Sequence, residues 1–319
     1  MTASTQKLAD TPEGPFWCID IGAGALSARI VNRGAALTDL RHAGVARPLV
    51  LGLADPLTYL TDREFLGAVV GRVANRIAGA HVRLGDRDYP LVPNEGPNML
   101  HGGPGGTWGR IWQLEEASAE AVTLSLVLED GDMGFPGRLH LEARYSCAGE
   151  RLSLELTGRA EAPTFCNLAS HLYYLRPPGT RLQVPAEHYQ AVSEGIPEGD
   201  PVPVEGGFDF RTPVPLSDPI DHNLCLARHR APCREVARLL TPDARLVLSS
   251  TEPGLQVYDG RHLDLPGGHA GARYRAGDAV ALEPQAWVDA PNRAWADQVR
   301  LEPGERYRQE TVVEVLPGG

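Results

Sequence analysis

Two side chains in this sequence could act together as an acid–base pair, because each stands in an otherwise apolar segment. His171 lies inside the strand-like residues 165–174, and Glu283 follows an apolar run in residues 281–292. An imidazole and a carboxyl group suit proton transfer near neutral pH. Each side chain is also typical of a structural role when taken alone, as a hydrogen-bonded core histidine or a solvent-facing carboxylate.

Two further segments are too polar and too rich in special residues to be plain strands. Small residues surround Arg72, Asn75 and Arg76 in residues 67–77, and residues 94–103 form a loop that presents His101 ahead of two glycines. The arginines could equally pair with surface acids. From the residues alone, these segments predict a polar pocket and no specific reaction.

The composition excludes several classes of chemistry and partner. The chain has 319 residues, 42% hydrophobic and 22% charged, with a net charge of -11, which disfavours nucleic acid and anionic membranes as partners. Lys7 is the only lysine. Schiff-base chemistry, pyridoxal phosphate attachment and a P-loop lysine each need an internal amine and are therefore excluded.

The cysteines and the hydropathy pattern bear on the compartment. No run of apolar residues approaches the length of a membrane span, and residues 1–15 contain no signal-peptide core. The cysteines are scattered without a C-x-x-C pair, at Cys18, Cys147, Cys166, Cys225 and Cys233. This distribution favours free thiols in a reducing cytoplasm over a disulfide framework or a zinc site.

The elements that must position these side chains are predicted to be strands. Apolar residues alternate with polar ones in residues 121–129, 138–147 and 151–158, separated by turn-rich residues. This period of two is typical of an antiparallel meander with one packed face. Similar short strands are expected at residues 16–20, 25–31, 36–41, 81–84, 88–91, 246–250, 254–258 and 311–316.

Helical periodicity is weak, and only residues 56–62 predict a short helical turn. The 35 glycines and 27 prolines punctuate the chain throughout. The predicted fold class is all-β, a large twisted antiparallel β-sandwich with few short helices. We expect residues 1–319 to form a single domain, with residues 1–14 as a flexible N-terminal segment.

Taken together, the polar segments resemble the aldose 1-epimerase (galactose mutarotase) family. The resemblance covers nearly the whole chain and follows the family's order of motifs. The matching segments are residues 71–77, 98–103, 167–171, 221–224, 253–258 and 282–287 running into 289–292. The resemblance implies the family's β-supersandwich, a small-molecule sugar substrate such as galactose or glucose, and neither a metal nor an organic cofactor.

Residue roles follow from the resemblance by motif position. His171 matches the general acid and Glu283 the general base, and their proximity is expected to favour an imidazolium–carboxylate pair. The residues that match sugar-hydroxyl contacts are Asn75, Arg76, His101, Asp221 and Gln256. Arg76 is expected to clamp adjacent hydroxyls, and Trp287 or Tyr173 could either stack on the sugar or belong to the core.

Three alternatives remain open at this point. A glycoside hydrolase could use Glu283 with Asp221 or Asp289 as paired carboxylates. A metal-dependent enzyme could use His101, His171 and Glu283 as ligands, although no two histidines have the usual short spacing. An inactive sugar-binding protein could share the fold. A monomer and a homodimer are both compatible with the sequence.

Overall fold

The alternating segments of the sequence form the predicted antiparallel strands in the computed structural model, which describes residues 4–62, 64–217 and 219–318. The meander consists of β11 (Ala121–Leu128), β12 (Leu139–Ala148) and β13 (Arg151–Ala160). Buried and exposed residues alternate along β12 for most of its length. Its apolar side chains from Leu139 to Cys147 therefore face the core, as the period of two predicts.

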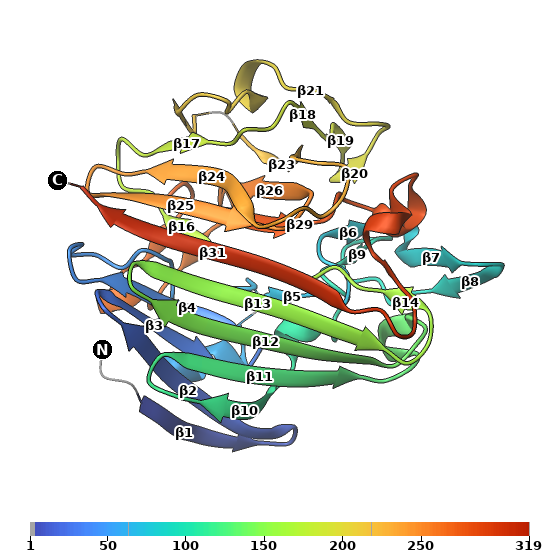
Figure 1. Cartoon of the computed structure of the whole chain (residues 1–319), viewed down its shortest axis with the longest axis horizontal. Helices are drawn as coiled ribbons and strands as arrows, with labels where there is room; N and C mark the ends of the chain where they lie inside the picture. Colours follow the sequence, from blue (N-terminus) through green and yellow to red (C-terminus); the bar gives the residue numbers. More distant parts are fainter. Residues whose placement is uncertain (1–3, 63, 218, 319) are drawn as a thin grey trace.

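The largest sheet described has nine strands in the order β10-β11-β12-β13-β31-β25-β24-β17-β22. Its C-terminal strand β31 lies in the middle, between β13 and β25 (Figure 1). We infer that the chain forms one domain, because this strand joins the two halves of the sheet. Besides β11, β12 and β13, this sheet contains β10 (Gln113–Ala117), β17 (Arg181–Gln183), β22 (Val214–Pro215), β24 (Arg234–Leu240), β25 (Ala244–Ser250) and β31 (Tyr307–Pro317).

A second sheet packs against the first and carries the polar motifs at residues 221–224, 254–258 and 282–285. Among the described residues it has six strands in the order β16-β29-β26-β23-β18-β21. One continuous core includes Leu156 and Val313 from the first sheet and Leu255 and Leu282 from the second. The strands are β16 (Tyr173–Leu175), β18 (His188–Tyr189), β21 (Val202–Pro203), β23 (Asp221–Cys225), β26 (Gly254–Tyr258) and β29 (Ala279–Gln285).

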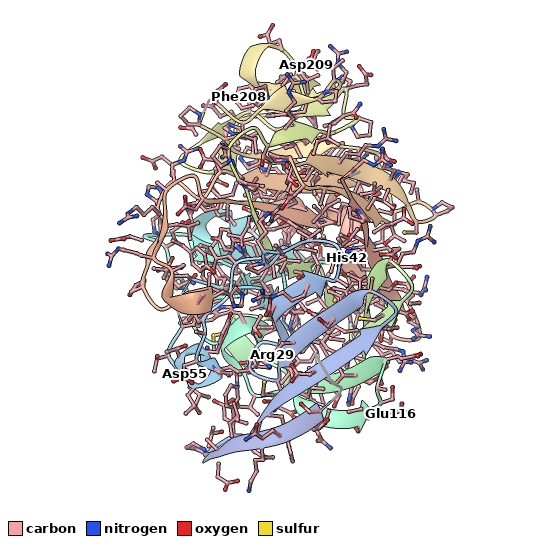
Figure 2. The ribbon with its side chains drawn as sticks, turned by 90° about the vertical axis from the view of Figure 1, so that its left-hand side faces the viewer. Arg29, His42, Asp55, Glu116, Phe208 and Asp209 are labelled. Carbon is pink, nitrogen blue, oxygen red and sulfur yellow. The ribbon has the colours of Figure 1, made fainter. Side chains whose placement is uncertain are left out.

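The N-terminal residues correct the expectation of a flexible segment at 1–14. Residues 4–11 form strand β1 (Ser4–Thr11), which pairs with β2 (Gly14–Ala23). The strand is a mostly exposed edge, so its polar sequence lacks the alternation that marks a strand. The sheet continues through β3 (Leu26–Val31) and β4 (Ala36–His42). Figure 2 shows Arg29 on this sheet and places Phe208 and Asp209 at the far end of the molecule.

The remaining elements are short, as predicted. The predicted turn at residues 56–62 is the 3-10 helix η1 (Pro56–Leu60), and none of the described helices could cross a membrane. The other 3-10 helices are η2 (Ala78–Ala80), η3 (Thr107–Gly109), η4 (Asp132–Gly134), η5 (Gly206–Phe208), η6 (His269–Gly271), η7 (Ala290–Asn292) and η8 (Ala296–Gln298).

Short strand pairs connect these elements. The predicted hairpin at residues 84–87 joins β7 (His81–Leu84) to β8 (Arg87–Pro90), with Gly85 at φ 60° in its turn. The other pairs are β5 (Val69–Val70) with β15 (Ala169–Ser170), β6 (Arg76–Ile77) with β9 (Met99–Leu100), β14 (Thr164–Phe165) with β30 (Arg300–Leu301), β19 (Val192–Ser193) with β20 (Ile196–Pro197), and β27 (Asp264–Leu265) with β28 (Tyr274–Arg275).

Buried amide side chains hold the chain where it leaves β29. The backbone N–H groups of residues 286, 287 and 288 donate in turn to Asn167 Oδ1, Gln298 Oε1 and Gln190 Oε1, at 2.9, 3.0 and 2.7 Å. Each amide is at most 4% exposed. Because an unpaired buried N–H is costly, these bonds allow an irregular segment to follow the strand inside the protein.

We expect Gln298→Leu to lower the free energy of unfolding by about 2 to 4 kcal/mol, because it leaves buried backbone groups without partners. Gln298 also donates to the carbonyl of Arg228 at 2.8 Å, so both ends of the amide are used. Urea denaturation followed by tryptophan fluorescence measures the loss.

The matched control is Gln183→Leu, which removes a solvent-accessible hydrogen bond to the carbonyl of Arg211. Water can replace that bond, so the control is expected within about 0.5 kcal/mol of the parent. Equal losses in the two variants would contradict a specific role for the buried amide.

Candidate active site

One cleft brings together all of the predicted site residues. It has a volume of about 320 Å³ and lies on the polar face of the six-stranded sheet. Its predicted members come from six regions of the chain, namely residues 75–76, residue 101, residue 171 and the strands β23, β26 and β29. The complete lining is Glu64, Phe65, Asn75, Arg76, Glu95, Leu100, His101, His171, Tyr173, Asp221, Gln256, Tyr258, His262 and Glu283.

A row of polar side chains crosses the sheet beneath this cleft. Glu283 is paired with Gln256, and Gln256 with Asn223. The register of β16 against β29 places His171 opposite Glu283, and Gln190 N–H donates to the carbonyl of Asn223. Cross-strand partners project to the same face, so the five side chains form one polar row.

Every member of this polar row is buried and has a polar atom without a protein partner. Exposure ranges from 0% to 5% along the row. The unpartnered atoms are His171 Nδ1, Glu283 Oε2, Gln256 Oε1, Asn223 Oδ1 and Gln190 Nε2. Buried polar atoms normally have partners, so a concentration of unpartnered ones marks a site prepared for a polar ligand or for water.

His171 and Glu283 form a close pair at the start of the polar row. Nε2 of His171 lies 3.6 Å from Oε1 of Glu283. Burial lowers the pKa of His171 to about 4. Burial, reinforced by the nearby Asp221, raises the pKa of Glu283 well above its ordinary value, against the opposing effect of Arg76.

The predicted imidazolium–carboxylate pair is therefore wrong for the side chains as they lie in the structure. Burial disfavours both charges and outweighs the attraction that proximity alone would supply. The pair is favoured as a neutral imidazole beside a carboxylic acid. This state holds one proton, the same number as the ion pair, so the two differ only in where that proton lies.

Arg76 contacts carboxylates on two sides of its guanidinium. Nε and Nη2 donate to the two carboxylate oxygens of Glu95 at 2.6 and 2.8 Å. Nη1 lies 3.8 Å from Oδ2 of Asp221. The sequence predicts that Arg76 binds two adjacent sugar hydroxyls, but two nitrogens of its guanidinium already bind Glu95. The third nitrogen, Nη1, faces Asp221.

Backbone geometry places His101 and Asn75 at the cleft. His101 and Asn75 have positive φ angles of 52° and 64°, a backbone conformation that residues other than glycine rarely adopt. Asn75 N–H donates to Nδ1 of His101 at 3.1 Å. Burial lowers the pKa of His101 well below its ordinary value, so the ring is neutral and its proton is on Nε2.

Aromatic side chains form one wall of the cleft, and sequence reasoning missed the central one. The ring of Phe65 lies 4.8 Å from that of His101 and 5.7 Å from that of His171. Tyr173 lines the cleft, whereas Trp287 packs in a separate hydrophobic cluster and is a core residue. Phe65 is an ordinary apolar residue in sequence, and its positive φ of 58° appears only in the structure.

Other rim residues also escaped the sequence analysis. Glu64 and His262 line the cleft but lie outside the polar segments and motifs, while Glu95 and Tyr258 lie within residues 94–103 and 253–258 without a role assigned from the sequence. Larger clefts of about 570, 600 and 370 Å³ lie elsewhere, and their described linings contain none of the residues predicted for catalysis or hydroxyl binding. We therefore place the chemistry in the smaller cleft.

The three residues of the metal alternative do come together. Ligand atoms of His101, His171 and Glu283 lie within 4.8 Å of one another. Nδ1 of His101 accepts a backbone N–H, so its Nε2 carries a proton and offers no lone pair to a metal. The donor set does not fit a metal in this arrangement, and His101 instead presents a hydrogen-bond donor.

The paired-carboxylate alternative loses one of its candidates. Asp289 is 2% exposed and does not line the cleft. Its Oδ2 accepts from Arg293 Nε at 2.7 Å, and its Oδ1 accepts from the backbone N–H of Ala78 at 3.1 Å. Asp289 therefore holds the chain around the site and does not face the ligand.

Comparison with known proteins agrees with the geometry. The family model described as aldose 1-epimerase matches residues 18–314. The chain is 35% identical to the galactose mutarotase of Sus scrofa over 309 residues, covering 90% of each chain. It is 32% identical to the aldose 1-epimerase of Escherichia coli (strain K12) over 325 residues, covering 93% of this chain and 91% of that protein.

Solved structures show the same fold. A GalM/aldose epimerase homologue from C. elegans superposes with a TM-score of 0.88 at 27% identity, covering 95% of this chain and 100% of that chain. Galactose 1-epimerase from Lactobacillus acidophilus also gives a TM-score of 0.88, at 25% identity over 100% of both chains. On the match of its sequence and fold, the chain belongs to the aldose 1-epimerase family.

Proposed function

We propose that this protein interconverts the α and β anomers of a free neutral aldose, such as galactose or glucose, by acid–base ring opening and reclosure. The observation that carries the proposal is the close pair of His171 and Glu283 in a cleft lined by hydroxyl-binding groups. The family membership supports the same reaction.

The reaction needs a proton acceptor and a proton donor on opposite sides of one C–O bond. A proton leaves the C1 hydroxyl while another reaches the ring oxygen, and the C1–O5 bond breaks to give the free aldehyde. Rotation about C1–C2 turns the aldehyde over. Closure on the opposite face reverses the two proton transfers and forms the other anomer.

In this proposal Glu283 takes the proton from the C1 hydroxyl and His171 gives a proton to the ring oxygen. The pair needs one proton in total, and the structure favours that count over a wide pH range. Sugar hydroxyls that donate to Glu283 stabilise its ionised form, which moves the shared proton to His171. Each group is expected to contribute ~10²–10⁴-fold to the rate.

The surrounding groups would hold the pyranose. Gln256 Nε2 donates to Asp221 Oδ1 at 2.7 Å, which leaves Gln256 Oε1 free to accept a sugar hydroxyl. His101 Nε2 offers a donor, and the rings of Phe65 and Tyr173 offer apolar surface for a sugar face. Fixing the substrate between these groups lowers the entropic cost of the reaction.

The charge of the cleft supports a neutral substrate. Its described lining contains four carboxyl groups, at Glu64, Glu95, Asp221 and Glu283, and Arg76 is the only arginine or lysine among those residues. Arg76 is already paired with Glu95. A phosphorylated or carboxylated sugar would therefore meet an acidic rim with no unpaired arginine, which disfavours it.

Location and assembly are further proposals. We propose that the protein is cytoplasmic, supported by its unpaired cysteines, four of which are buried thiols that need no disulfide. The expectation of a monomer or homodimer stays a prediction.

We expect Glu283→Gln to lower the turnover number for anomer interconversion by at least ~10²-fold, because it removes the general base. Polarimetry on freshly dissolved α-D-galactose, α-D-glucose, L-arabinose and D-xylose measures the rate and the sugar preference. The spontaneous rate is subtracted in each case.

Two controls accompany the Glu283→Gln variant. Because folding raises the pKa of Glu283, the parent loses stability as pH rises and this carboxyl group ionises. The Glu283→Gln variant has no such ionisation, so its melting temperature at alkaline pH should be no lower than that of the parent. Glu95→Gln makes the same change at the rim and should retain most of the turnover. A folded Glu283→Gln protein with near-normal turnover would remove Glu283 from the proposed role.

The pH profile of kcat/KM should be a broad bell, because activity needs one proton on the His171–Glu283 pair. Below about pH 4 His171 takes up a second proton and no acceptor remains. Above the raised pKa of Glu283 the last proton leaves and no donor remains. An acid limb near 6.5, the ordinary pKa of histidine, would contradict the proposed proton count.

We expect exhaustive EDTA treatment to leave the rate unchanged, since the proton on His101 Nε2 opposes metal binding. Metal analysis of the treated protein confirms that any bound metal was removed. Activity that is lost with EDTA and restored by a divalent cation would favour the metal alternative.

A further inference from the structure

The backbone pairing divides at the catalytic pair, because His171 lies between β15 and β16, and we call this point the fork. β16 pairs with β29 through Tyr173 and Ala281, whereas the two residues before His171 form β15, which pairs with β5. The last backbone bond between the two strands, from Leu282 N–H to the carbonyl of Leu172, is long at 3.4 Å. The regular ladder therefore ends at the point where the distance between the two side chains matters.

Two side chains of β31, Tyr307 and Gln309, form a hydrogen-bonded bridge between the two sides of this fork. The hydroxyl of Tyr307 accepts the backbone N–H of Leu168 at 2.9 Å and donates to Gln309 Oε1 at 2.7 Å. Gln309 Nε2 then donates to the carbonyl of Pro284 at 2.8 Å. One end of the bridge lies three residues before His171, and the other end is the residue that follows Glu283.

The directions of these bonds are determined by their end groups. The carbonyl of Pro284 can only accept, so Gln309 must offer it Nε2 and keep Oε1 for Tyr307. The Tyr307 hydroxyl can then both donate to Gln309 and accept from Leu168. Both side chains are buried, at 4% and 1% exposure, so water cannot substitute for a lost bond.

The bridge is anchored to a rigid element. β31 pairs with β13 over residues 307–314 and with β25 over residues 311–317, so the bridge residues themselves are held by the ladder with β13. The guanidinium of Arg230 lies 4.6 Å from the centre of the Tyr307 ring and further fixes that side chain. A stiff strand of one sheet is thus connected to both branches of the fork in the other sheet.

We propose that Tyr307 and Gln309 are positioning residues that set the separation of His171 and Glu283. Neither residue lines the cleft, so they act through the backbone on either side of the pair. A displacement of about 1 Å in a catalytic geometry can cost about 10²-fold in rate. The inference rests on the proposed function of the pair.

The test compares Tyr307→Phe with Tyr59→Phe. Tyr307→Phe keeps the ring and its contact with Arg230 and removes only the hydroxyl of the bridge. Tyr59 is also a buried tyrosine whose hydroxyl accepts a backbone N–H, that of Leu53 at 3.2 Å, but it lies away from the cleft. Tyr59→Phe loses one accepted backbone bond, whereas Tyr307→Phe loses an accepted backbone bond and also the bond donated to Gln309 at the fork.

We expect Tyr307→Phe to lower kcat by about tenfold or more with KM within about twofold of the parent, since the hydroxyl-binding groups stay in place. Tyr59→Phe should keep kcat within about twofold. Crystal structures of the parent and the Tyr307→Phe variant should show a greater separation of His171 Nε2 and Glu283 Oε1 in the variant. Gln309→Met breaks the same bridge and takes the place of Tyr307→Phe in this test if that variant does not fold.

Several outcomes would overturn the inference. One is an unchanged distance between His171 Nε2 and Glu283 Oε1 in folded Tyr307→Phe. The others are equal losses of kcat in the two tyrosine variants, or a raised KM with retained kcat in Tyr307→Phe. If the parent interconverts no anomers, the proposed function fails instead. The crystallographic separation still tests the bridge in that case, because it does not depend on activity.

Discussion

The structure depends on the burial of an imidazole and a carboxyl group side by side at the end of a β-ladder. Burial moves the two pKa values in opposite directions, that of His171 down and that of Glu283 up. The pair consequently keeps a single proton over a wide range of pH. A reaction that must give one proton and take another at the same moment needs this state, whichever of the two groups holds the proton at rest.

Such a pair is costly to fold, and the surrounding structure compensates for it with amides. Gln256 and Asn223 continue the polar row with side chains that carry no charge. Asn167, Gln190 and Gln298 satisfy the backbone where the chain leaves β29. Neutral amides can hydrogen-bond in a low dielectric without the desolvation cost of ions, which suits them to the interior beneath the site.

The two sheets have different roles in this arrangement. Glu283 lies on the six-stranded sheet and His171 lies just before its strand β16, where the pairing divides, while the nine-stranded sheet is continuous. Tyr307 and Gln309 extend from the continuous sheet to the forked one. Their hydrogen bonds connect the backbone on the two sides of the pair at a point where none of the described regular ladder bonds does so.

Much of the fold could be predicted from the sequence, because strands such as residues 121–128 alternate in hydrophobicity and need no distant information. β1 could not be predicted, since an exposed edge strand has no such alternation. The site residues were found through motifs, yet their charge states were not, because a pKa depends on burial that only packing creates.

Residue types and their order along the chain thus determined the fold class, the absence of lysine chemistry and the residues gathered in the cleft. Tertiary structure alone decided that Glu95 takes the clamp of Arg76, that Phe65 lies against two histidines, and that His101 donates from Nε2. The physical reason is that hydrogen-bond partners and burial are properties of neighbours in space. Residues far apart in sequence supply those neighbours, and no local pattern records them.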